Sequence, residues 1–413
     1  MDSRLVTSIS RRKLLAGTTA ATTMLAAPAI VGAQANALKI GVLLPRSGYM
    51  ASTGQSSHRG AMIAPKVLSD YGHRVELIHI DTESNVDAAR IAAQRAINDG
   101  VHCIVGNVDS GGTLAVAQVC EQRQMPLVVN VGAAPQITEQ GFKYVARNFP
   151  HAGMLMGGGL RLIKNLLDVT KLDAKTAVFF YANDTFGQAQ RGALDALFPR
   201  AGLPFQVIDH VAFDPRAQEL SVEVTKIRAS NPDIVMVVTR GNDAVKLIRD
   251  MVRQRFLPKA IISPGSSGMF EEEYYQTLGP LADYTIFHLP WANPKSHMAH
   301  ALEAAFKPAF PNYRFPVECF YVGFTFEALL VAAGAFKRSG STNGPELMKA
   351  IRETSIADHI IIGPPITFDE KGQNVGIPSA SVQSRNRTPT VVLPTEVATM
   401  TPVLPMPPWQ DRS

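Results

Sequence analysis

Four short stretches combine hydroxyl groups, glycines and the start of a helical run, a set of groups suited to binding an anion. These stretches are PRSGYMASTGQSS (45–57), GNVDSGGT (106–113), NVGAAPQIT (130–138) and YANDTFGQ (181–188). Free backbone N–H groups at a helix start point at a bound anion, and the helix dipole favours negative charge there. The sequence therefore predicts loops that hold a small anionic group.

Ser110 is the clearest candidate within these stretches, because Gly111 and Gly112 follow it directly and a helical run is expected from near Thr113. Its hydroxyl and the neighbouring amides offer donors to a carboxylate. The same pattern is also typical of a plain helix cap at Ser110 or Thr113, and both interpretations stay open at this point. What favours binding is the expectation that several such loops meet at one edge of a sheet.

The elements that must position these loops alternate along the chain. Strand-like runs occupy 38–45, 74–81, 101–106, 125–130, then 176–181, 205–210, 233–238 and 259–264. Helical runs lie between them at 56–68, 85–98, 113–122, then 186–197, 217–229 and 243–255. Parallel strands need a crossover of a dozen or more residues, which a helix supplies. The pattern predicts an α/β protein of two doubly wound, Rossmann-like lobes, whose ligands bind beyond the carboxyl ends of the strands.

The last third of the chain is not expected to form a third domain. Its pattern predicts a strand at 283–290, helices at 296–310, 317–336 and 344–353, and short strands near Ile366, Ala380 and Val391. The proline-dense residues 396–413 predict an extended tail. A chain of 413 residues with 46% hydrophobic and 18% charged residues has room for two domain cores.

The N-terminus is typical of an export signal. Paired Arg11 and Arg12, of the twin-arginine kind, precede a short apolar run over 14–31 and an A-x-A site that predicts cleavage near Ala35. Residues 1–35 hold three of the five net positive charges, so the rest of the chain is only weakly basic. A nucleic-acid partner is therefore not expected. No later stretch is expected to span a bilayer, which predicts a periplasmic protein without membrane insertion.

Cysteines show no spacing typical of a metal site, and the one weak hint, His297 with His300 on a helix face, is interpreted as a pair of surface residues. Cys103 and Cys120 are expected to be two buried thiols, with a disulfide between them as the open alternative. The sequence holds no C-x-x-C, H-E-x-x-H, G-x-S-x-G, Walker loop or dinucleotide fingerprint after a strand. We therefore expect a protein that is not an enzyme and binds no cofactor and no metal. An exported enzyme is the rival interpretation, since twin-arginine signals often accompany a cofactor bound before export.

Four segments in this order carry a family resemblance: IGVLLPRSGYMASTGQSSHRGAMIA, DTESNVDAARIAAQRAINDGVHCIVGNVDSGGTLAVAQ, FYANDTFGQAQRGALDAL and GPPITFDEKGQNVG. Over nearly its whole length after the signal, the chain resembles the periplasmic substrate-binding proteins of branched-chain amino-acid-type ABC importers. The resemblance implies the type I periplasmic binding protein fold, with two lobes, a three-stranded hinge and a ligand closed between the lobes. It also implies delivery to an ABC permease and its ATPase, while a ligand sensor that docks on a membrane receptor would have the same sequence features.

Carried onto this chain, the resemblance also implies domain limits. The first lobe would comprise 38–149 plus 284–364, and the second would comprise 150–283 plus 365–395. The three crossings between them would lie near 147–151, near 289–293 and near Pro364. Trp291 in the second crossing would either lean into the cleft or pack in the core.

The resemblance assigns ligand-binding roles position by position. Ser110, with Gly111, keeps the carboxylate-binding serine, whereas the threonine of the next loop aligns with Ala133 and leaves the amides of Ala133 and Ala134. The family's first-loop aromatic aligns with Thr53, with Tyr49 nearby as a substitute. Across the cleft, its second aromatic aligns with Phe186 and its acidic position falls at Gly265 and Ser266.

That lost acidic group weakens the case for an α-amino acid, because a buried ammonium needs a carboxylate partner. Asp109 and Asp184 would compensate, or would serve only as caps. Arg240 would pair with a ligand carboxylate, or would be an exposed loop arginine. The ligand is therefore expected to be a small amino acid, an amide or another carboxylate.

Overall fold

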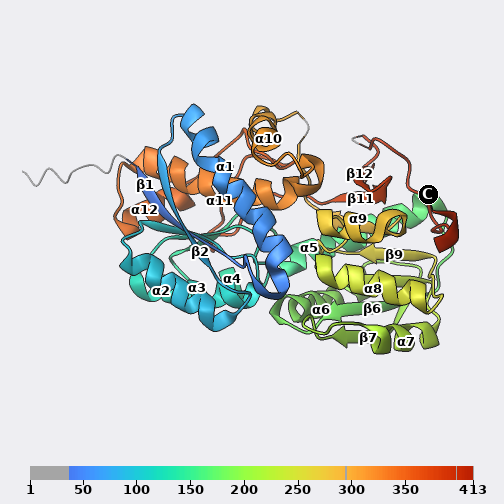
Figure 1. Ribbon diagram of the computed structural model, residues 1–413. Coiled ribbons are helices and arrows are strands. Elements are labelled where there is room, and N and C mark those ends of the chain that lie inside the picture. Colours follow the sequence, from blue (N-terminus) through green and yellow to red (C-terminus); the bar gives the residue numbers. More distant parts are fainter. Residues whose placement is uncertain (1–36, 294, 397, 413) are drawn as a thin grey trace, which may run out of the picture. The chain divides into compact units, whose positions relative to one another are not determined.

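The computed structural model describes residues 37–293, 295–396 and 398–412, so the predicted export signal lies outside the described residues. Two sheets organise them (Figure 1). The first sheet is parallel, in the order β2-β1-β3-β4-β5. Its strands are β1 (Leu38–Leu44), β2 (Val75–Asp81), β3 (Cys103–Gly106), β4 (Leu127–Val129) and β5 (Val145–Arg147).

The second sheet has seven strands in the order β12-β11-β10-β9-β8-β6-β7. Strands β6 to β10 pair in parallel, and β11 runs antiparallel to both of its neighbours. Its strands are β6 (Thr176–Ala182), β7 (Gln206–Phe213), β8 (Ile234–Val238), β9 (Ala260–Ser263), β10 (Ile286–Leu289), β11 (Ala380–Arg385) and β12 (Thr388–Leu393).

Helices cover the sheets, and each sheet with its helices is called a lobe below. The first lobe contains α1 (Ala51–Asp70), α2 (Val86–Asn98), α3 (Ser110–Arg123), α4 (Gln136–Glu139), α10 (His297–Ala309), α11 (Phe315–Ser339) and α12 (Gly344–Arg352). The second contains α5 (Ala152–Thr170), α6 (Thr185–Leu197), α7 (Ser221–Ser230), α8 (Gly241–Arg253) and α9 (Glu272–Leu278). Single 3₁₀ turns lie at Gly48–Met50, Phe198–Arg200, Gly279–Ala282 and Trp409–Asp411.

Alternate residues of the inner strands supply two cores in the first lobe. Val42 and Val105 pack with α1 and α11 on one face, whereas Leu43 and Ile104 pack with α2 and α3 on the other. Successive side chains of a strand point to opposite faces of the sheet. When both faces are covered, all of these side chains are buried, and the strand appears in the sequence as a continuous apolar run. This is why the runs at 38–45 and 101–106 predicted strands correctly, and the two-lobed α/β fold is confirmed.

Helix α11 corrects the expectation that no later stretch has the length and composition to span a bilayer. Among the described residues it is the one helix long and apolar enough to do so, but 94% of its most apolar window is buried inside the protein. It packs against α1, α10 and α12 and against strands β3 and β4. Its apolar surface is therefore that of a core helix, buried all round.

Two predicted lobe limits are wrong. Strand β10 pairs with β9 and β11 of the second sheet, so the residues after 284 do not start the first lobe. At the third crossing, the amide of Arg147 donates to the carbonyl of Gly372 at 2.7 Å, and the amide of Asn374 donates to the carbonyl of Arg147 at 3.0 Å. The segment after Pro364 therefore still lies beside β5, and the chain reaches the second sheet only at Ala380.

Several local predictions also need correction. Helix α3 begins at Ser110 rather than near Thr113, because Asp109 is its N-cap. The strand expected near Ile366 is only an isolated bridge to Ile356. Helices α5 and α9 were not predicted. Residues 398–412 lie along the second lobe, with one 3₁₀ turn, and the amide of Met406 donates to the carbonyl of Lys259 at 2.9 Å. The cysteines are buried free thiols, as expected for Cys103 and Cys120.

Candidate ligand-binding site

Two adjoining pockets lie at the carboxyl ends of the strands, and both are lined by residues of the two lobes. The inner pocket comprises about 400 Å³ of space free of protein atoms, and the outer pocket about 490 Å³, and both volumes include space open to solvent. Phe186 and Arg240 line both pockets and so stand at the boundary between them. Strand ends that converge from two sheets are where ligands bind in open α/β folds.

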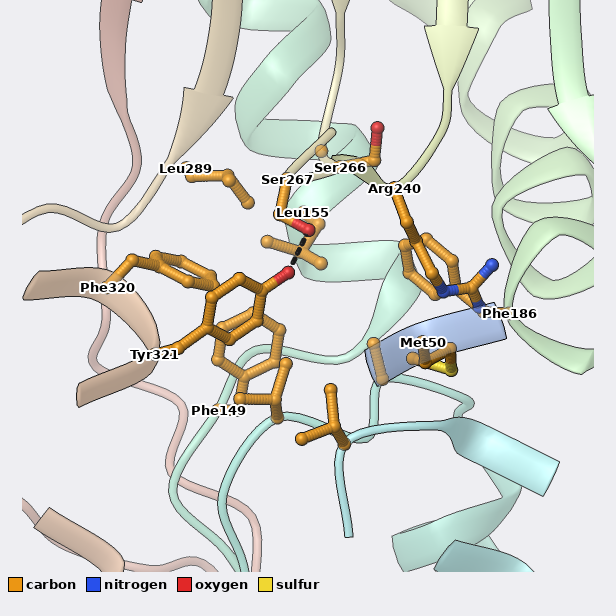
Figure 2. A pocket seen from close by; sticks show the side chains of 14 residues that line it. Met50, Phe149, Leu155, Phe186, Arg240, Ser266, Ser267, Leu289, Phe320 and Tyr321 are labelled. Carbon is orange, nitrogen blue, oxygen red and sulfur yellow. Dashed lines mark hydrogen bonds between the residues drawn. The ribbon is translucent and has the colours of Figure 1, made fainter. Parts of the chain in front are cut away.

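The inner pocket is mostly apolar and rich in aromatic rings (Figure 2). Phe149 follows β5, whereas Phe320 and Tyr321 come from the first turns of α11. The rings of Phe149 and Phe320 meet edge to face with their centroids 5.8 Å apart. Further lining residues are Met50, Val108, Val131, Ala133, Leu155, Phe186, Arg240, Gly265, Ser266, Ser267 and Leu289. This lining suits an apolar, ring-sized body.

Arg240 is the single charged side chain among these inner-pocket lining residues. It is the N-cap residue of α8, and its side chain is only 9% exposed. Nη2 donates to Asp184 Oδ2 at 2.8 Å, and the guanidinium carbon lies 5.3 Å from the centroid of the Phe186 ring. Nη1 is buried and has no hydrogen-bond partner. A buried unpaired donor of this kind costs free energy unless a ligand satisfies it.

The electrostatics keep Arg240 charged. Burial alone would lower the pKa of Arg240, but Asp184, Tyr49, Asp243 and Asp109 outweigh burial and raise this pKa above its ordinary value. A charged guanidinium in a partly dry site attracts a carboxylate strongly and can bind it with two parallel hydrogen bonds. The alternative of an exposed loop arginine is therefore wrong.

The outer pocket is polar and holds two carboxylates that already have partners. Asp109 caps α3 through the amide of Gly112 and also accepts from Asn107 Nδ2 at 2.7 Å. Asp184 caps α6 through the amide of Gly187 at 2.9 Å, in addition to its ion pair with Arg240. The lining residues of this pocket are Tyr49, Ser84, Val86, Asp109, Ser110, Gly111, Asp184, Thr185, Phe186, Arg216 and Arg240. Asp109 and Asp184 therefore act as helix caps, and both also line the outer pocket.

Ser110 connects the predicted loop 106–113 to the predicted loop 130–138 through hydrogen bonds. Its Oγ accepts hydrogen bonds from the amides of Ala133 at 3.2 Å and Ala134 at 3.1 Å. Buried Arg147 holds the same loop, because its Nη1 donates to the carbonyl of Ala134 at 2.7 Å. Ser110 is therefore not the helix cap, a role that belongs to Asp109, and its hydroxyl lies among the amides predicted to hold an anion.

The structure brings most of the predicted ligand-binding residues together at the two pockets. The inner pocket is lined by Ala133, Phe186, Arg240 and Ser266, and the outer pocket by Tyr49, Ser110, Gly111, Asp184, Phe186 and Arg240. Ala134 lies behind Ser110. Thr53 lines neither pocket, because its hydroxyl donates to Glu271 at 3.1 Å. The Ser266 hydroxyl is likewise engaged, since it accepts from the amide of Thr239 at 3.0 Å.

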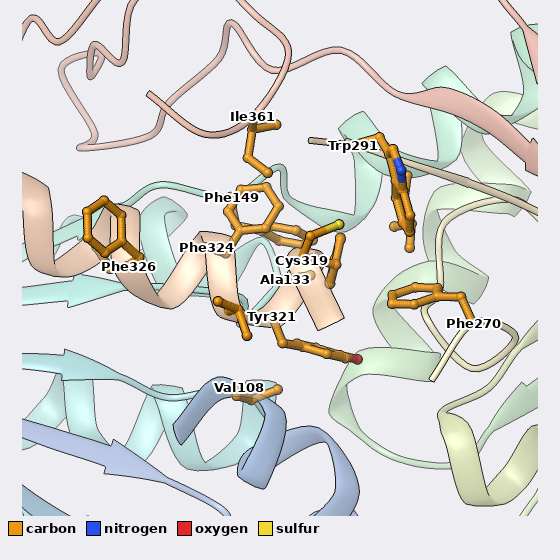
Figure 3. Close-up of a cluster of buried hydrophobic side chains, with 14 of the residues drawn as sticks. Val108, Ala133, Phe149, Phe270, Trp291, Cys319, Tyr321, Phe324, Phe326 and Ile361 are labelled. Carbon is orange, nitrogen blue, oxygen red and sulfur yellow. The ribbon is translucent and has the colours of Figure 1, made fainter. Parts of the chain in front are cut away.

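The sequence did not indicate two parts of the site: the aromatic side chains from α11 that line the inner pocket, and the buried carboxylate of Glu271. Phe320 and Tyr321 lie in a helix that is apolar all round, where no pattern separates a pocket residue from a core residue. Trp291, which was considered for the cleft, packs in the core against Phe270, with ring centroids 5.3 Å apart (Figure 3). The part of the chain that the structure describes contains no group of three or more potential metal ligands.

Comparison with known proteins decides the family. Residues 37–383 match the family model described as periplasmic binding protein. The chain belongs to the periplasmic binding protein family. The resemblance drawn from the order of the sequence segments is thereby confirmed, and with it the type I two-lobed fold of the branched-chain amino-acid type.

Curated relatives of this periplasmic binding protein match only part of their own length. A Leu/Ile/Val-binding protein homolog from Brucella melitensis is 26% identical over 236 residues, which are 55% of this chain and 58% of that protein. Thus the match spans under two thirds of the curated relative.

Solved structures of similar fold cover more of the chain. A leucine-binding protein from Thermotoga maritima is 23% identical, with a TM-score of 0.71, and the match covers 86% of this chain and 97% of that chain. A solute-binding protein of an ABC transporter from R. palustris, in complex with benzoate, is 19% identical, with a TM-score of 0.73 and coverage of 86% and 95%. At these identities the likeness concerns the fold.

Proposed function

We propose that this periplasmic binding protein captures a small organic carboxylate with an apolar, ring-sized body between its two lobes and delivers it to an ABC importer. The observation that carries the proposal is the buried Nη1 of Arg240, which lacks a partner at the edge of an apolar pocket. A carboxylate would satisfy this donor, while Phe149, Phe320 and Tyr321 would contact the body of the ligand.

The charges of the site favour a carboxylate without an α-ammonium group. None of the residues that line the inner pocket is acidic. The two carboxylates of the outer pocket are committed to Arg240 and to helix caps. An ammonium placed in the inner pocket would therefore lose its hydration without gaining a carboxylate.

Solved relatives are consistent with this choice of ligand class. The R. palustris protein was crystallised with benzoate, a ring with one carboxylate. A branched-chain amino-acid transporter substrate-binding protein from Streptococcus pneumoniae, 18% identical with a TM-score of 0.72 and coverage of 86% and 97%, was crystallised with isoleucine. An amino acid is accordingly the second candidate, favoured by Asp109 and Asp184 in the outer pocket.

Capture would work by differential binding to two states. A ligand that contacts both lobes stabilises the closed state over the open state, and only contacts made in the closed state shift that equilibrium. Arg240 and Phe186 belong to the second lobe, and Ala133 and Tyr321 to the first, so a ligand in the inner pocket touches both.

Calorimetric titration of the mature protein tests the proposal. The panel is benzoate, phenylacetate, benzamide and leucine. We expect the two acids to bind and benzamide to bind at least about tenfold more weakly, because a neutral amide does not satisfy the guanidinium charge. Leucine bound more tightly than both acids would replace the proposal with the amino-acid candidate. Binding of none of the four would reject this class of ligand.

Export is tested separately. We propose that residues 1–35 direct the chain to the periplasm, and replacement of both Arg11 and Arg12 by lysine should leave the precursor in the cytoplasm if the twin-arginine route is used. Cell fractionation and the mass of the mature protein provide the readout. Normal export of this double variant would exclude that route.

A further inference from the structure

Glu271 is a carboxylate of the second lobe that lies buried against the first lobe. It is the N-cap residue of α9 and is 5% exposed. Its Oε2 accepts a hydrogen bond from Ser52 Oγ at 2.8 Å, and its Oε1 accepts one from Thr53 Oγ1 at 3.1 Å. Both hydroxyls belong to the first turn of α1, so Glu271 connects the two lobes directly.

The same carboxylate contacts groups next to the inner pocket without lining the pocket. The hydroxyl of Tyr321 donates to Oε1 at 3.5 Å and also forms a hydrogen bond with Ser267 of the second lobe. The amide of Gly241, adjacent to Arg240, donates to Oε1 at 3.3 Å. A Cβ atom at position 241 would lie 2.3 Å from Oε2, so any larger residue there would displace this carboxylate.

The partners of Glu271 are hydroxyls and one amide rather than a cation. Tyr321 of α11 contacts Glu271 and the charge of Glu318, also in α11, acts on it. The other charged residues of this region are Arg59 of α1, which pairs with Glu318, Arg240, which precedes Gly241, and Glu272 and Glu273, which follow Glu271 in the sequence. Arg59 is committed to Glu318, with Nη2 and Oε2 2.6 Å apart. Burial raises the pKa of Glu271 to about 7, opposed by its hydrogen bonds and increased by the charge of Glu318.

Resting on lobe closure as proposed above, we propose that Glu271 is a positioning residue that couples closure of the lobes to uptake of a proton. Opening separates Glu271 from Ser52 and Thr53 and returns it to water, where its pKa takes the ordinary value of a glutamate. The closed state then binds more protons than the open state. The resulting stabilisation of closure is fully present below the ordinary pKa and is lost as the pH rises through the raised pKa.

Distance measurements between the lobes test this coupling without any ligand. Spin labels at Met62→Cys in α1 and Val222→Cys in α7 report on the two lobes, because both positions are exposed and the three native cysteines are buried. Between about pH 7.5 and about pH 5.5 we expect the ratio of closed to open molecules to rise roughly tenfold. Glu271→Gln should remove this dependence and give a high ratio at both pH values.

Two further variants separate the coupling from a structural role. Asp250→Asn removes a carboxylate that is 2% exposed within the second lobe and should leave the pH dependence intact. Ser52→Ala combined with Thr53→Val keeps Glu271 but removes its first-lobe donors, so the pH dependence should move to higher pH. An unchanged slope in Glu271→Gln, or no slope in the parent protein, overturns the proposal.

Benzoate affinity, measured by calorimetry, distinguishes this inference from the proposed function. Affinity should rise roughly tenfold over the same pH interval in the parent protein and stay constant in Glu271→Gln. Equal slopes in the two proteins would reject the role of Glu271 and leave the ligand proposal standing. Distances that respond to pH in a protein that does not bind benzoate would support the role of Glu271 and count against the proposed ligand.

Discussion

The inner and outer pockets share Phe186 and Arg240 but differ in how far their polar groups are satisfied. The inner pocket is lined mainly by aromatic and aliphatic side chains, and Arg240, at the boundary of the two pockets, has one buried donor without a partner. In the outer pocket, Asp109, Asp184 and Ser110 are all hydrogen-bonded within the protein. Polar residues alone therefore do not mark a binding site. A buried polar atom without a partner at the edge of a pocket is the stronger indication, because the protein gains free energy when a ligand satisfies it.

Arg240→Met gives the largest expected effect on this comparison. The variant removes the donor that the two pockets share, and we expect affinity for benzoate to fall by about a hundredfold, since a hydrogen bond to a charged group contributes about 1.5–3 kcal/mol. Arg249→Gln on the same helix is the matched control, because Arg249 is exposed and should not affect binding. Calorimetry provides the measurement, and equal affinities of the two variants would contradict the assignment.

Filling each pocket in turn shows which one holds the ligand body. Val131→Phe reduces the inner pocket and should lower affinity at least about tenfold, because the added ring takes the space of the ligand. Val86→Phe places the same ring in the outer pocket and should change affinity by less than about threefold. If the second variant has the larger effect, the ligand occupies the outer pocket.

Asp184→Asn tests whether the outer pocket binds the ammonium group of an amino-acid ligand. Asparagine caps a helix as well as aspartate does, so α6 should be preserved. The change removes a negative charge from beside Arg240, and we expect benzoate to bind about threefold to tenfold more tightly. An amino acid would bind more weakly to the same variant if Asp184 held its ammonium. Parallel titrations with benzoate and leucine decide between the two.

Ser110→Ala is expected to affect stability more than affinity. The hydroxyl is an acceptor for two buried amides, so its removal should lower the free energy of unfolding by about 1–3 kcal/mol. Denaturant titration measures this loss. Benzoate affinity should fall by less than tenfold, and a loss as large as that of Arg240→Met would place the carboxylate at Ser110 instead.

The sequence predicted the loops at the strand ends of the site, but not the residues of other elements that line the inner pocket or lie beside it. Ser110, Phe186 and Arg240 follow apolar runs directly, and the carboxyl ends of parallel strands face one edge, so their meeting could be predicted. Tyr321 and Glu271 could not be found in this way. Each lies in or next to a helix whose partners are remote in the sequence, and local patterns carry no information about such contacts.

The crossings between the lobes likewise depend partly on local sequence patterns and partly on contacts between distant segments. The first, which the resemblance implies near 147–151, falls where the chain passes from β5 to α5, although the sequence pattern predicted no strand at 145–147. The third was placed too early, because the pairing of Arg147 with Gln373 joins segments more than two hundred residues apart. The resemblance implies a crossing near Pro364, but glycines and prolines there do not indicate to which sheet the chain leads.

The sequence by itself determined the alternation of strands and helices and the position of the loops, because these follow from side-chain periodicity and short-range turn chemistry. The family followed from the order of four sequence segments that resemble it. Only the tertiary structure decided that β10 joins the second sheet, that α11 is a buried core helix, and that Nη1 of Arg240 has no partner. These features depend on which distant segments pack together, and that choice is made by the burial and hydrogen bonding of the whole chain rather than by any local stretch.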